Sequence, residues 1–280
     1  MPLSLPTCET LLPTQKGSRL DVVLNRPESR NAINARMAEE FSALLDWLNE
    51  CDGIRLVVLR GAGGHFCAGG DIKERRSMGE EAAQDGSDPV KARNERAGQG
   101  FLKFQNLPQT TIAAVEGSAF GGGLGFACMA DITIVTKGAR MGMPETRLGI
   151  APAQIAPFVV KRVGLARARQ LALTASRFGG QQAYDYGIAQ YLCEDGELDQ
   201  MLEDVAAQVM ACAPKASAAT KEILLAVGTI PDDELPGFAA ERFAALSRGP
   251  EGREGQAAFA EKRAPNWASM DADMVEGDAR

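Results

Sequence analysis

The sequence contains a single histidine, His65, among its 280 residues. A mechanism that needs two imidazoles is therefore excluded, and a Ser-His-Asp triad would depend on this one residue. The six cysteines are scattered and form no C-x-x-C pair. We therefore expect the reduced thiols of a cytoplasmic protein, with no disulfide framework and no metal site.

Long apolar runs and an excess of positive charge are also lacking. No apolar stretch approaches the roughly 20 residues that span a bilayer, and the N-terminal segment has no basic region followed by an apolar one, which argues against a secretory signal. The net charge of −7 and the isoelectric point near 5.0 argue against general binding to nucleic acid or to anionic membranes. A soluble protein with one large domain, or a domain with an appendage, is expected at this length.

Strand-like and helix-like patterns alternate in the first two thirds of the chain, which is typical of an α/β layer. We predict strands over residues 19–24, 54–59, 110–115 and 132–136. Helices are predicted after Asn34 and over residues 155–163 and 165–174. The polar segment 75–100 is interpreted as a loop over the functional site.

Beyond residue 197 the pattern is wholly helical. The predicted helices span residues 198–212, 216–227, 234–246 and 251–262, with prolines between them. We therefore divide the chain into an α/β body, residues 1–196, and a helical region, residues 197–280, that serves assembly.

Two glycine-rich segments each follow a strand and precede a helix. The first contains Ala68, Gly70 and Asp71, and the second is the run Gly121, Gly122 and Gly123. Glycine lets a ligand approach the backbone closely, and a helix start offers free N–H groups.

A carboxylate, Glu145, returns directly after Pro144. Two backbone N–H donors and one carboxylate are the parts of a site that activates a carbonyl group.

Plainer interpretations exist for the same residues. The glycines could serve close packing of a helix on a strand, and Glu145 could cap the segment that follows it. Asp71 is better explained as a helix N-cap than as a proton carrier. His65 is interpreted as a surface or hydrogen-bonded residue, and Asp131 as structural.

The chain resembles the crotonase, or enoyl-CoA hydratase/isomerase, superfamily from about residue 19 to residue 267. The segments that carry the resemblance are LNRPESRNAIN at 24–34, HFCAGGDIKE at 65–74, VEGSAFGGGLGFA at 115–127, MPETRLGIAP at 143–152 and AFAEKRAPNW at 258–267.

This resemblance implies a spiral of ββα units (ClpP-like) with a C-terminal helical trimerisation region, assembled as a homotrimer or a dimer of trimers. It also implies an acyl-CoA thioester as the substrate, with no further cofactor. By motif position, the backbone N–H groups of Gly70 and Gly122 bind the thioester oxygen, and Glu145 is the acid/base. The implied contacts with coenzyme A or substrate come from Ala68, Asp71, Ile72, Lys73, Gly121 and, from its own or an adjacent subunit, Lys262.

One position departs from the pattern of the family. Typical hydratases of the superfamily carry a second glutamate just after the glycine run, and that position is Gly125 here. Together with PETRLGIAPAQIAPFVVKRVG, this variant resembles the methylglutaconyl-CoA and isohexenylglutaconyl-CoA hydratase branch of leucine and acyclic-terpene catabolism, and more closely its isohexenylglutaconyl member. Two alternatives follow: either Glu145 both activates the water and delivers the proton, or the substrate supplies the second group, since a glutaconyl thioester carries its own distal carboxylate.

Three functions are compatible with these residues. The first is a lyase that adds water to a branched enoyl-CoA. The second is a Δ3,Δ2-enoyl-CoA isomerase, for which one carboxylate suffices. The third is an inactive homologue that binds acyl-CoA thioesters without converting them.

Overall fold

A six-stranded sheet forms the centre of the protein in a computed structural model, which describes residues 4–72, 74 and 88–269. The strand order is β1-β2-β3-β4-β6-β9; β1 and β2 are antiparallel, and the other neighbours are parallel. The strands of this sheet are β1 (Leu11–Lys16), β2 (Arg19–Leu24), β3 (Leu56–Gly61), β4 (Thr110–Val115), β6 (Ile132–Thr136) and β9 (Tyr191–Cys193). This arrangement confirms the predicted α/β class.

A second sheet of three strands, in the order β5-β7-β8, stands beside the first. Its strands are β5 (Ser118–Phe120), β7 (Arg140–Gly142) and β8 (Arg177–Gly179). Three residues are too few for a recognisable alternation of apolar and polar side chains, and for this reason the sequence did not predict these strands or β9. The second sheet positions the glycine run, because β5 leads directly into it.

The helices of the body are α1 (Ala35–Asn49), α3 (Pro89–Gln105), α4 (Gly122–Met129), α5 (Ala156–Thr174), α6 (Gly180–Asp185) and α7 (Leu198–Met210), with short 3₁₀ helices η1 (Pro27–Ser29) and η2 (Glu145–Leu148). The helix predicted after Asn34 is α1, and the Asn34 side chain caps it by accepting a hydrogen bond of 2.9 Å from the Met37 N–H. The two helices predicted over 155–174 are the two arms of α5, which Gly164 separates with φ 76° and ψ 161°.

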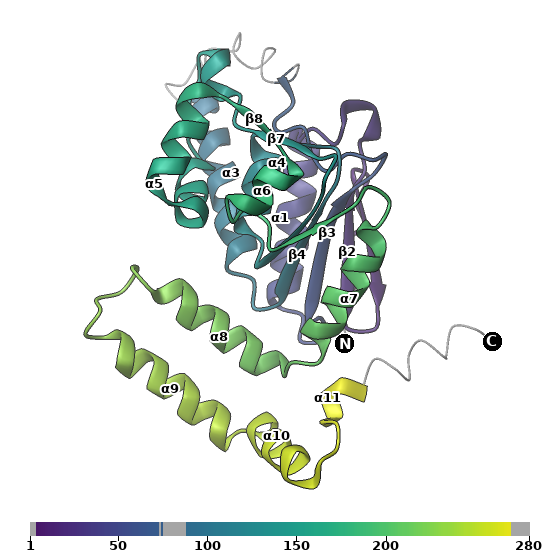
Figure 1. Ribbon diagram of the computed structural model, residues 1–280, viewed down its shortest axis with the longest axis vertical. Helices are drawn as coiled ribbons and strands as arrows, with labels where there is room; N and C mark the ends of the chain where they lie inside the picture. The colour runs from purple at the N-terminus through teal and green to yellow at the C-terminus, as the bar shows by residue number, and fades with distance from the viewer. Residues whose placement is uncertain (1–3, 73, 75–87, 270–280) are drawn as a thin grey trace, which may run out of the picture.

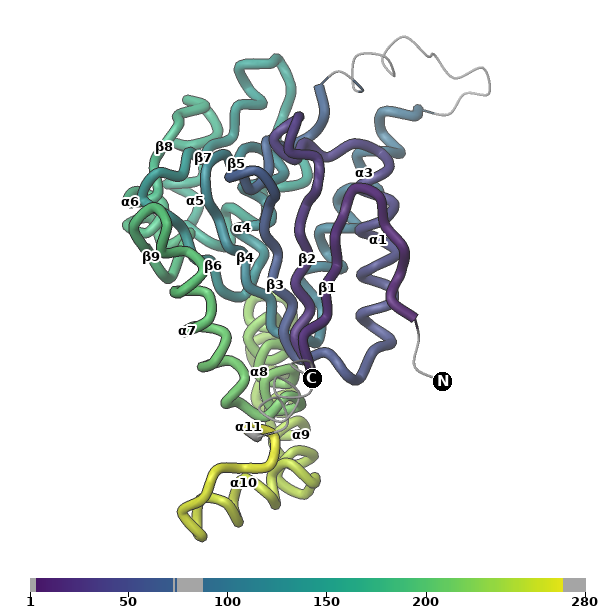
Figure 2. Tube along the Cα trace, turned by 90° about the vertical axis from the view of Figure 1, so that its right-hand side faces the viewer, coloured from purple at the N-terminus to yellow at the C-terminus, as the bar shows by residue number. Residues whose placement is uncertain are grey.

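Helices cover both faces of the main sheet, as Figure 2 shows with α1 and α3 on one side and α7 on the other. The side chains of β3 alternate accordingly. Val57 and Leu59 join the larger core, which α1, α3, α4 and α5 share, while Leu56 and Val58 pack with α7 in a smaller core. A parallel sheet that is buried on both faces requires such continuous apolar strands.

The prediction of a loop over 75–100 is wrong from Pro89 onward, where α3 begins. Residues 75–87 lie outside the described part of the chain. The Asp88 carboxylate accepts a hydrogen bond of 3.0 Å from the Lys91 N–H, and Pro89 occupies the first turn. Both are helix-start signals, but the polar composition of the exposed face concealed them. Phe101 and Phe104 on the buried face hold α3 against the core.

The C-terminal helices form a layer beneath the body (Figure 1). They are α8 (Pro214–Ala226), α9 (Leu235–Arg248), α10 (Pro250–Glu261) and α11 (Asn266–Ser269). Lys221 of α8 joins the layer to the body through a 2.8 Å ion pair with Asp131, whose carboxylate also accepts hydrogen bonds from the Thr111 N–H and hydroxyl. These bonds agree with the structural role predicted for Asp131.

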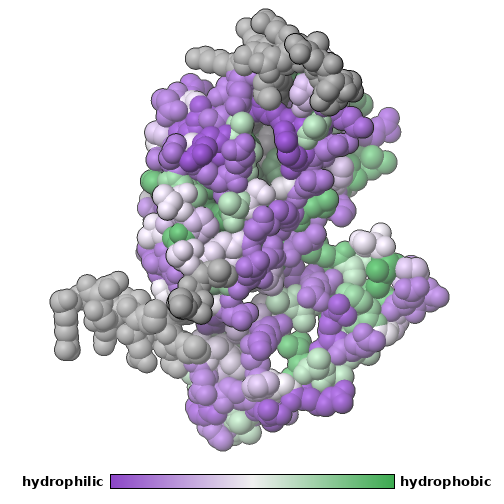
Figure 3. Space-filling model, turned by 180° about the vertical axis from the view of Figure 1, so that it is seen from behind, coloured by the Kyte–Doolittle hydropathy of each residue, from purple (hydrophilic) through white to green (hydrophobic). Residues whose placement is uncertain are grey.

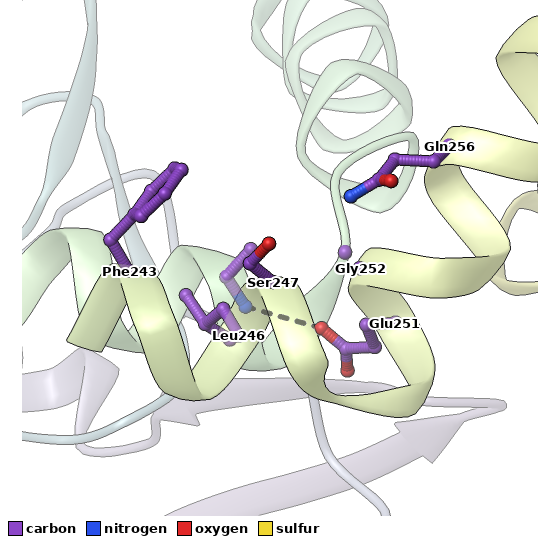
Figure 4. Close-up of a pocket in the computed structure, with 8 residues that line it drawn as sticks. Phe243, Leu246, Ser247, Glu251, Gly252 and Gln256 are labelled. Atoms are coloured by element: carbon purple, nitrogen blue, oxygen red, sulfur yellow. Dashed lines mark hydrogen bonds between the residues drawn. The ribbon is translucent and has the colours of Figure 1, made fainter. Parts of the chain in front are cut away.

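Apolar side chains are exposed along this helical layer. Seen from behind, apolar surface gathers toward the α8–α9 turn (Figure 3). Leu224 is 67% exposed, Phe243 72% and Phe259 88%. Phe243 projects from α9 beside an open cavity of about 280 Å³, whose other edge is Glu251 of α10 (Figure 4). The Glu251 carboxylate accepts a hydrogen bond from the Ala216 N–H at 3.2 Å, which ties α10 to the start of α8.

Among the described residues, no helix is both long and apolar enough to cross a membrane.

Candidate active site

The two glycine-rich segments lie side by side, although about fifty residues separate them in the sequence. Cys67 and Ala119 form a parallel bridge, in which the Cys67 N–H donates to Ser118 and the Phe120 N–H donates to Cys67. Two residues further along, Gly69 and Gly121 touch. A Cβ atom placed on Gly121 would lie 3.7 Å from the Gly69 Cα. Gly70 follows Gly69, and Gly122 follows Gly121. Gly70 and Gly122 therefore lie at the same end of this pairing.

The backbone of Gly70 is oriented by Ile33. The Ile33 N–H donates to Gly69, and the Asp71 N–H donates to Ile33, in a parallel bridge between Ile33 and Gly70. In a parallel bridge of this kind the residue between the two hydrogen bonds points its own N–H group away from the partner chain. The Gly70 N–H thus faces the side opposite Ile33.

Gly122 is the first residue of α4, so its N–H has no acceptor within the helix. Gly70 and Gly122 are also partly exposed, whereas Gly69, Gly121 and Gly123 are buried. The positive end of the helix dipole adds to the attraction of an oxyanion at this position. The two N–H groups predicted to bind a thioester oxygen are therefore near one another and accessible.

Gly121 sets the geometry between these donors and the carboxylate. Its φ of 53° and ψ of −119° lie in a region that only glycine adopts readily. Its own N–H donates to Gly142 at 3.0 Å, which fixes the turn before α4. A Cβ atom on Gly121 would lie 2.8 Å from Glu145 Oε1. The carboxylate predicted to act as acid/base therefore lies against the turn that precedes Gly122.

Glu145 begins η2, directly after Pro144. Its residue is half-buried, and its Oε2 atom is fully buried. The backbone around it is held because the Ile150 N–H donates to the Glu145 carbonyl at 3.2 Å and the Thr146 hydroxyl donates to Ala172 of α5 at 2.8 Å. A carboxylate on such a fixed turn is suited to proton transfer at one defined place.

Gly125 faces hydrocarbon. A Cβ atom on Gly125 would lie 2.6 Å from Cγ2 of Ile155, a residue that is only 4% exposed. Of the two alternatives, the structure therefore favours the one in which Glu145 serves both proton transfers, because the Ile155 side chain packs against Gly125. Burying a charged carboxylate against that side chain would also cost desolvation energy.

Phenylalanine rings form the apolar floor behind α4. Phe101 of α3 packs edge-to-face on Phe126 at a centroid distance of 5.2 Å, and on Phe158 of α5 at 6.4 Å. Phe101 Cζ would lie 3.6 Å from a Cβ atom on Gly122, and Ile33 Cδ1 3.0 Å. The space in front of the two N–H donors is thus bordered by aromatic and aliphatic side chains.

The other predicted contacts divide into those near the glycines and those elsewhere. Ala68 is half-buried beside them, and Ile72 is 50% exposed. The Asp71 carboxylate accepts a long N-cap hydrogen bond of 3.4 Å from the Glu74 N–H and forms an ion pair with Arg26 at 3.1 Å. Both partners favour the structural interpretation of Asp71.

Lys73 and Lys262 are the two remaining predicted contacts. Lys73 lies outside the described residues. Lys262 follows α10 in the helical layer, below the body that carries α4 (Figure 1), so its own chain does not bring it to the glycines. The contact of Lys262 with coenzyme A, from its own or an adjacent subunit, stays a prediction.

Two reactive side chains near the site have structural roles. The Nδ1 atom of His65 accepts a hydrogen bond of 3.2 Å from the Ser118 N–H, as the hydrogen-bonded interpretation requires. Complete burial raises the pKa of the Cys67 thiol to about 12, so the thiol stays protonated at neutral pH and does not act as a nucleophile.

The sequence did not single out Ile33, Phe101 and Ile155 as residues of the site. Ile33 lies in a segment that was used only as a family motif, and Phe101 directly follows the segment 75–100 that was interpreted as a loop. For Ile155, the pairing with Gly125 spans 30 positions in the sequence. No local pattern could have revealed that contact.

Known proteins resemble this chain over nearly its whole length. A family model described as enoyl-CoA hydratase/isomerase matches residues 14–270. A carnitinyl-CoA dehydratase from Proteus mirabilis is 33% identical over 262 residues, which cover 91% of this chain and 96% of that protein.

Solved structures agree. An enoyl-CoA hydratase/isomerase from Marinobacter aquaeolei is 44% identical with a TM-score of 0.89, and AtuE from Pseudomonas aeruginosa is 45% identical with the same score. Each comparison covers 93% of this chain and 100% of the other. The resemblance predicted from the motifs is confirmed: the chain belongs to the enoyl-CoA hydratase/isomerase family and has the crotonase fold.

Proposed function

We propose that this protein is a hydratase that adds water to an α,β-unsaturated, branched acyl-CoA. The observation that carries the proposal is that Glu145 lies beside Gly121, directly before Gly122, and that Gly70 lies on the neighbouring segment. One carboxylate and two N–H donors meet at one place, and hydration of an enoyl thioester requires both. Coenzyme A arrives with the substrate, so the reaction calls for no resident cofactor.

The proposed reaction has two proton transfers through one group. Glu145 removes a proton from water as the water oxygen bonds to the β-carbon, and the electrons of the double bond move to the thioester oxygen. The N–H groups of Gly70 and Gly122 stabilise that enolate oxygen. Glu145 then returns the proton to the α-carbon, and the carbonyl re-forms. No second carboxylate is needed if the same group serves as base and then as acid.

A glutaconyl thioester, isohexenylglutaconyl-CoA or 3-methylglutaconyl-CoA, is the substrate we propose. Support comes from the resemblance of the GGG-x-G and PETRLGIAPAQIAPFVVKRVG segments to that branch. The apolar surroundings of Gly125 suit the hydrocarbon branch on the β-carbon of such a substrate. The carnitinyl-CoA dehydratase among the relatives supports water addition or removal as the reaction type, because dehydration is hydration in reverse.

A Δ3,Δ2-enoyl-CoA isomerase is the second candidate. The Ile155 side chain over Gly125 favours it, because an isomerase needs only one carboxylate and gains from a dry site. In that reaction Glu145 would move a proton between two carbons, and no water would add.

Incorporation of solvent oxygen distinguishes these functions. We expect 3-methylglutaconyl-CoA and isohexenylglutaconyl-CoA to gain labelled oxygen in H₂¹⁸O much faster than crotonyl-CoA, as measured by mass spectrometry. Equal rates with crotonyl-CoA would contradict the proposed substrate. A shifted double bond without label would establish the isomerase, and binding without any conversion would establish the inactive homologue.

We further propose that the protein assembles in the cytoplasm as a homotrimer or a dimer of trimers through its helical layer, α8 to α11, which lies within the predicted 197–280 region. Leu224, Phe243 and Phe259 are exposed there, and burial of such residues against a second copy is favourable at about 25 cal/mol per Å² of apolar surface. Light scattering should give a mass of three or six chains, and a monomer would contradict the proposal.

A further inference from the structure

Two consecutive residues, Gln154 and Ile155, insert between two helices at positions where each helix has a glycine. A Cβ atom on Gly98 of α3 would lie 2.1 Å from Gln154 Oε1, and one on Gly125 of α4 would lie 2.6 Å from Ile155 Cγ2. Any larger residue at either glycine would displace the inserted side chain. We call Gln154 and Ile155 the wedge.

The wedge is held in place from both sides. The Gln154 side-chain amide donates to Asn94 of α3 at 2.6 Å. The Ile155 carbonyl accepts the Val159 N–H at 3.1 Å and thereby begins α5. The hydrogen bond fixes the half-buried Gln154 side chain, and close packing fixes the buried Ile155 side chain, so the wedge presents one shape to its surroundings.

The wedge also borders the site. Gly125 lies three residues after Gly122 on α4, so both point to the same face of that helix. On α3, Phe101 lies three residues after Gly98 and reaches toward Gly122. A thioester bound at the Gly122 N–H would therefore extend its acyl group toward the surface that Ile155 and Phe101 form.

We propose that the wedge determines the substrate specificity of this enzyme. The Ile155 side chain forms the wall against which the β-carbon branch of the substrate packs, and the Gln154 side chain fixes how far this wall projects toward the substrate. This inference rests on the proposed function. In an apolar pocket, one methylene group more or less changes selectivity by about 10- to 200-fold. The wall thus favours a thioester with a hydrocarbon branch over the unbranched analogue.

Ile155→Ala tests the proposal with two substrates that differ by one methyl group on the β-carbon, 3-methylglutaconyl-CoA and glutaconyl-CoA. We expect the variant to lower the preference for the branched substrate, expressed as a ratio of kcat/KM values, by about 10-fold or more. Ile188→Ala is the matched control, because Ile188 is also a buried isoleucine but lies in the chain segment between α6 and β9. An unchanged ratio in Ile155→Ala, or an equal change in Ile188→Ala, would overturn the proposal.

Gly125, against which Ile155 packs, supplies a second, independent variant. Gly125→Ala should displace Ile155 and lower the same ratio, and the double variant Gly125→Ala/Ile155→Ala should lose no more than Ile155→Ala alone, because the wall is already absent and no clash remains. If the effects of the two substitutions simply added, the contact between Ile155 and Gly125 would not determine the selectivity, and the proposal would be overturned.

Binding separates failure of this inference from failure of the proposed function. Calorimetry with the saturated thioesters 3-methylglutaryl-CoA and glutaryl-CoA gives a ratio of Kd values without turnover. If Ile155→Ala lowers that ratio but the wild type hydrates nothing, the wedge stands and the hydratase assignment fails. If the wild type hydrates glutaconyl thioesters and neither ratio changes, the wedge alone fails.

Discussion

Glu145→Gln is expected to lower kcat for hydration by about 10³- to 10⁴-fold, the upper range for loss of a general acid–base group. The reason is that the proposed mechanism passes both protons through Glu145, since Ile155 rather than a second carboxylate faces Gly125. Glutamine has nearly the same shape, so the turn at Pro144 and the site around Gly121 should persist. Steady-state hydration of 3-methylglutaconyl-CoA at saturating substrate measures the effect.

Glu116→Gln is the control for this prediction. Glu116 precedes Gly117 near the site, but its carboxylate lies 4.0 Å from Arg60 in an ion pair on the protein surface. Exposed pairs of this kind contribute roughly 0–1 kcal/mol to stability. We expect Glu116→Gln to change kcat by only a few-fold. If it were as damaging as Glu145→Gln, or if Glu145→Gln retained most of its activity, the assignment of Glu145 as acid/base would be wrong.

Gly122→Pro is expected to lower kcat by about 10²- to 10³-fold, the loss associated with one oxyanion donor. Proline replaces the N–H hydrogen by a ring carbon and adds a Cβ atom, and it is tolerated at the first helical position because that N–H is not used within the helix. Gly122 holds this position in α4. Gly121 before it can accommodate a following proline, because its φ of 53° and ψ of −119° mirror the extended conformation that proline requires of its predecessor.

Gly122→Ala is the matched variant, because it adds a Cβ atom at the same place but keeps the N–H group. That Cβ would lie 3.0 Å from Ile33 Cδ1 and 3.6 Å from Phe101 Cζ, both at the ends of side chains that can adjust. We expect a much smaller loss in Gly122→Ala than in Gly122→Pro, with similar circular dichroism spectra and melting temperatures. Equal losses in the two variants would show that the added bulk, and not the missing donor, is responsible.

Elements with strong local patterns were predictable from the sequence. Residues 110–115 and 132–136 are strands with the predicted bounds, because buried parallel strands read as continuous runs of aliphatic and β-branched residues. The strand predicted at 54–59 lies two residues later, since no turn residue marks where its hydrogen bonding begins. α3 was missed because its Asp88-Pro89 start lies within a polar segment.

The individual parts of the site were predictable in the same way. A glycine run before a helix and a carboxylate after proline indicate the chemistry from residue type, and the family resemblance then assigned the roles to Gly70, Gly122 and Glu145. Their proximity could not be predicted. It depends on the bridge between Cys67 and Ala119, a pairing of two segments that local propensity does not encode.

By itself, the sequence determined the family, the α/β class and the three groups proposed to carry the reaction, because these follow from short motifs and local periodicity. Only the tertiary structure decided what faces Gly125. The sequence left open whether a substrate carboxylate or Glu145 alone replaces the missing glutamate, and close packing places the Ile155 side chain at Gly125. The physical reason is that a glycine beside a helix start does not leave a void: a side chain from elsewhere in the chain fills the space to the density of the interior.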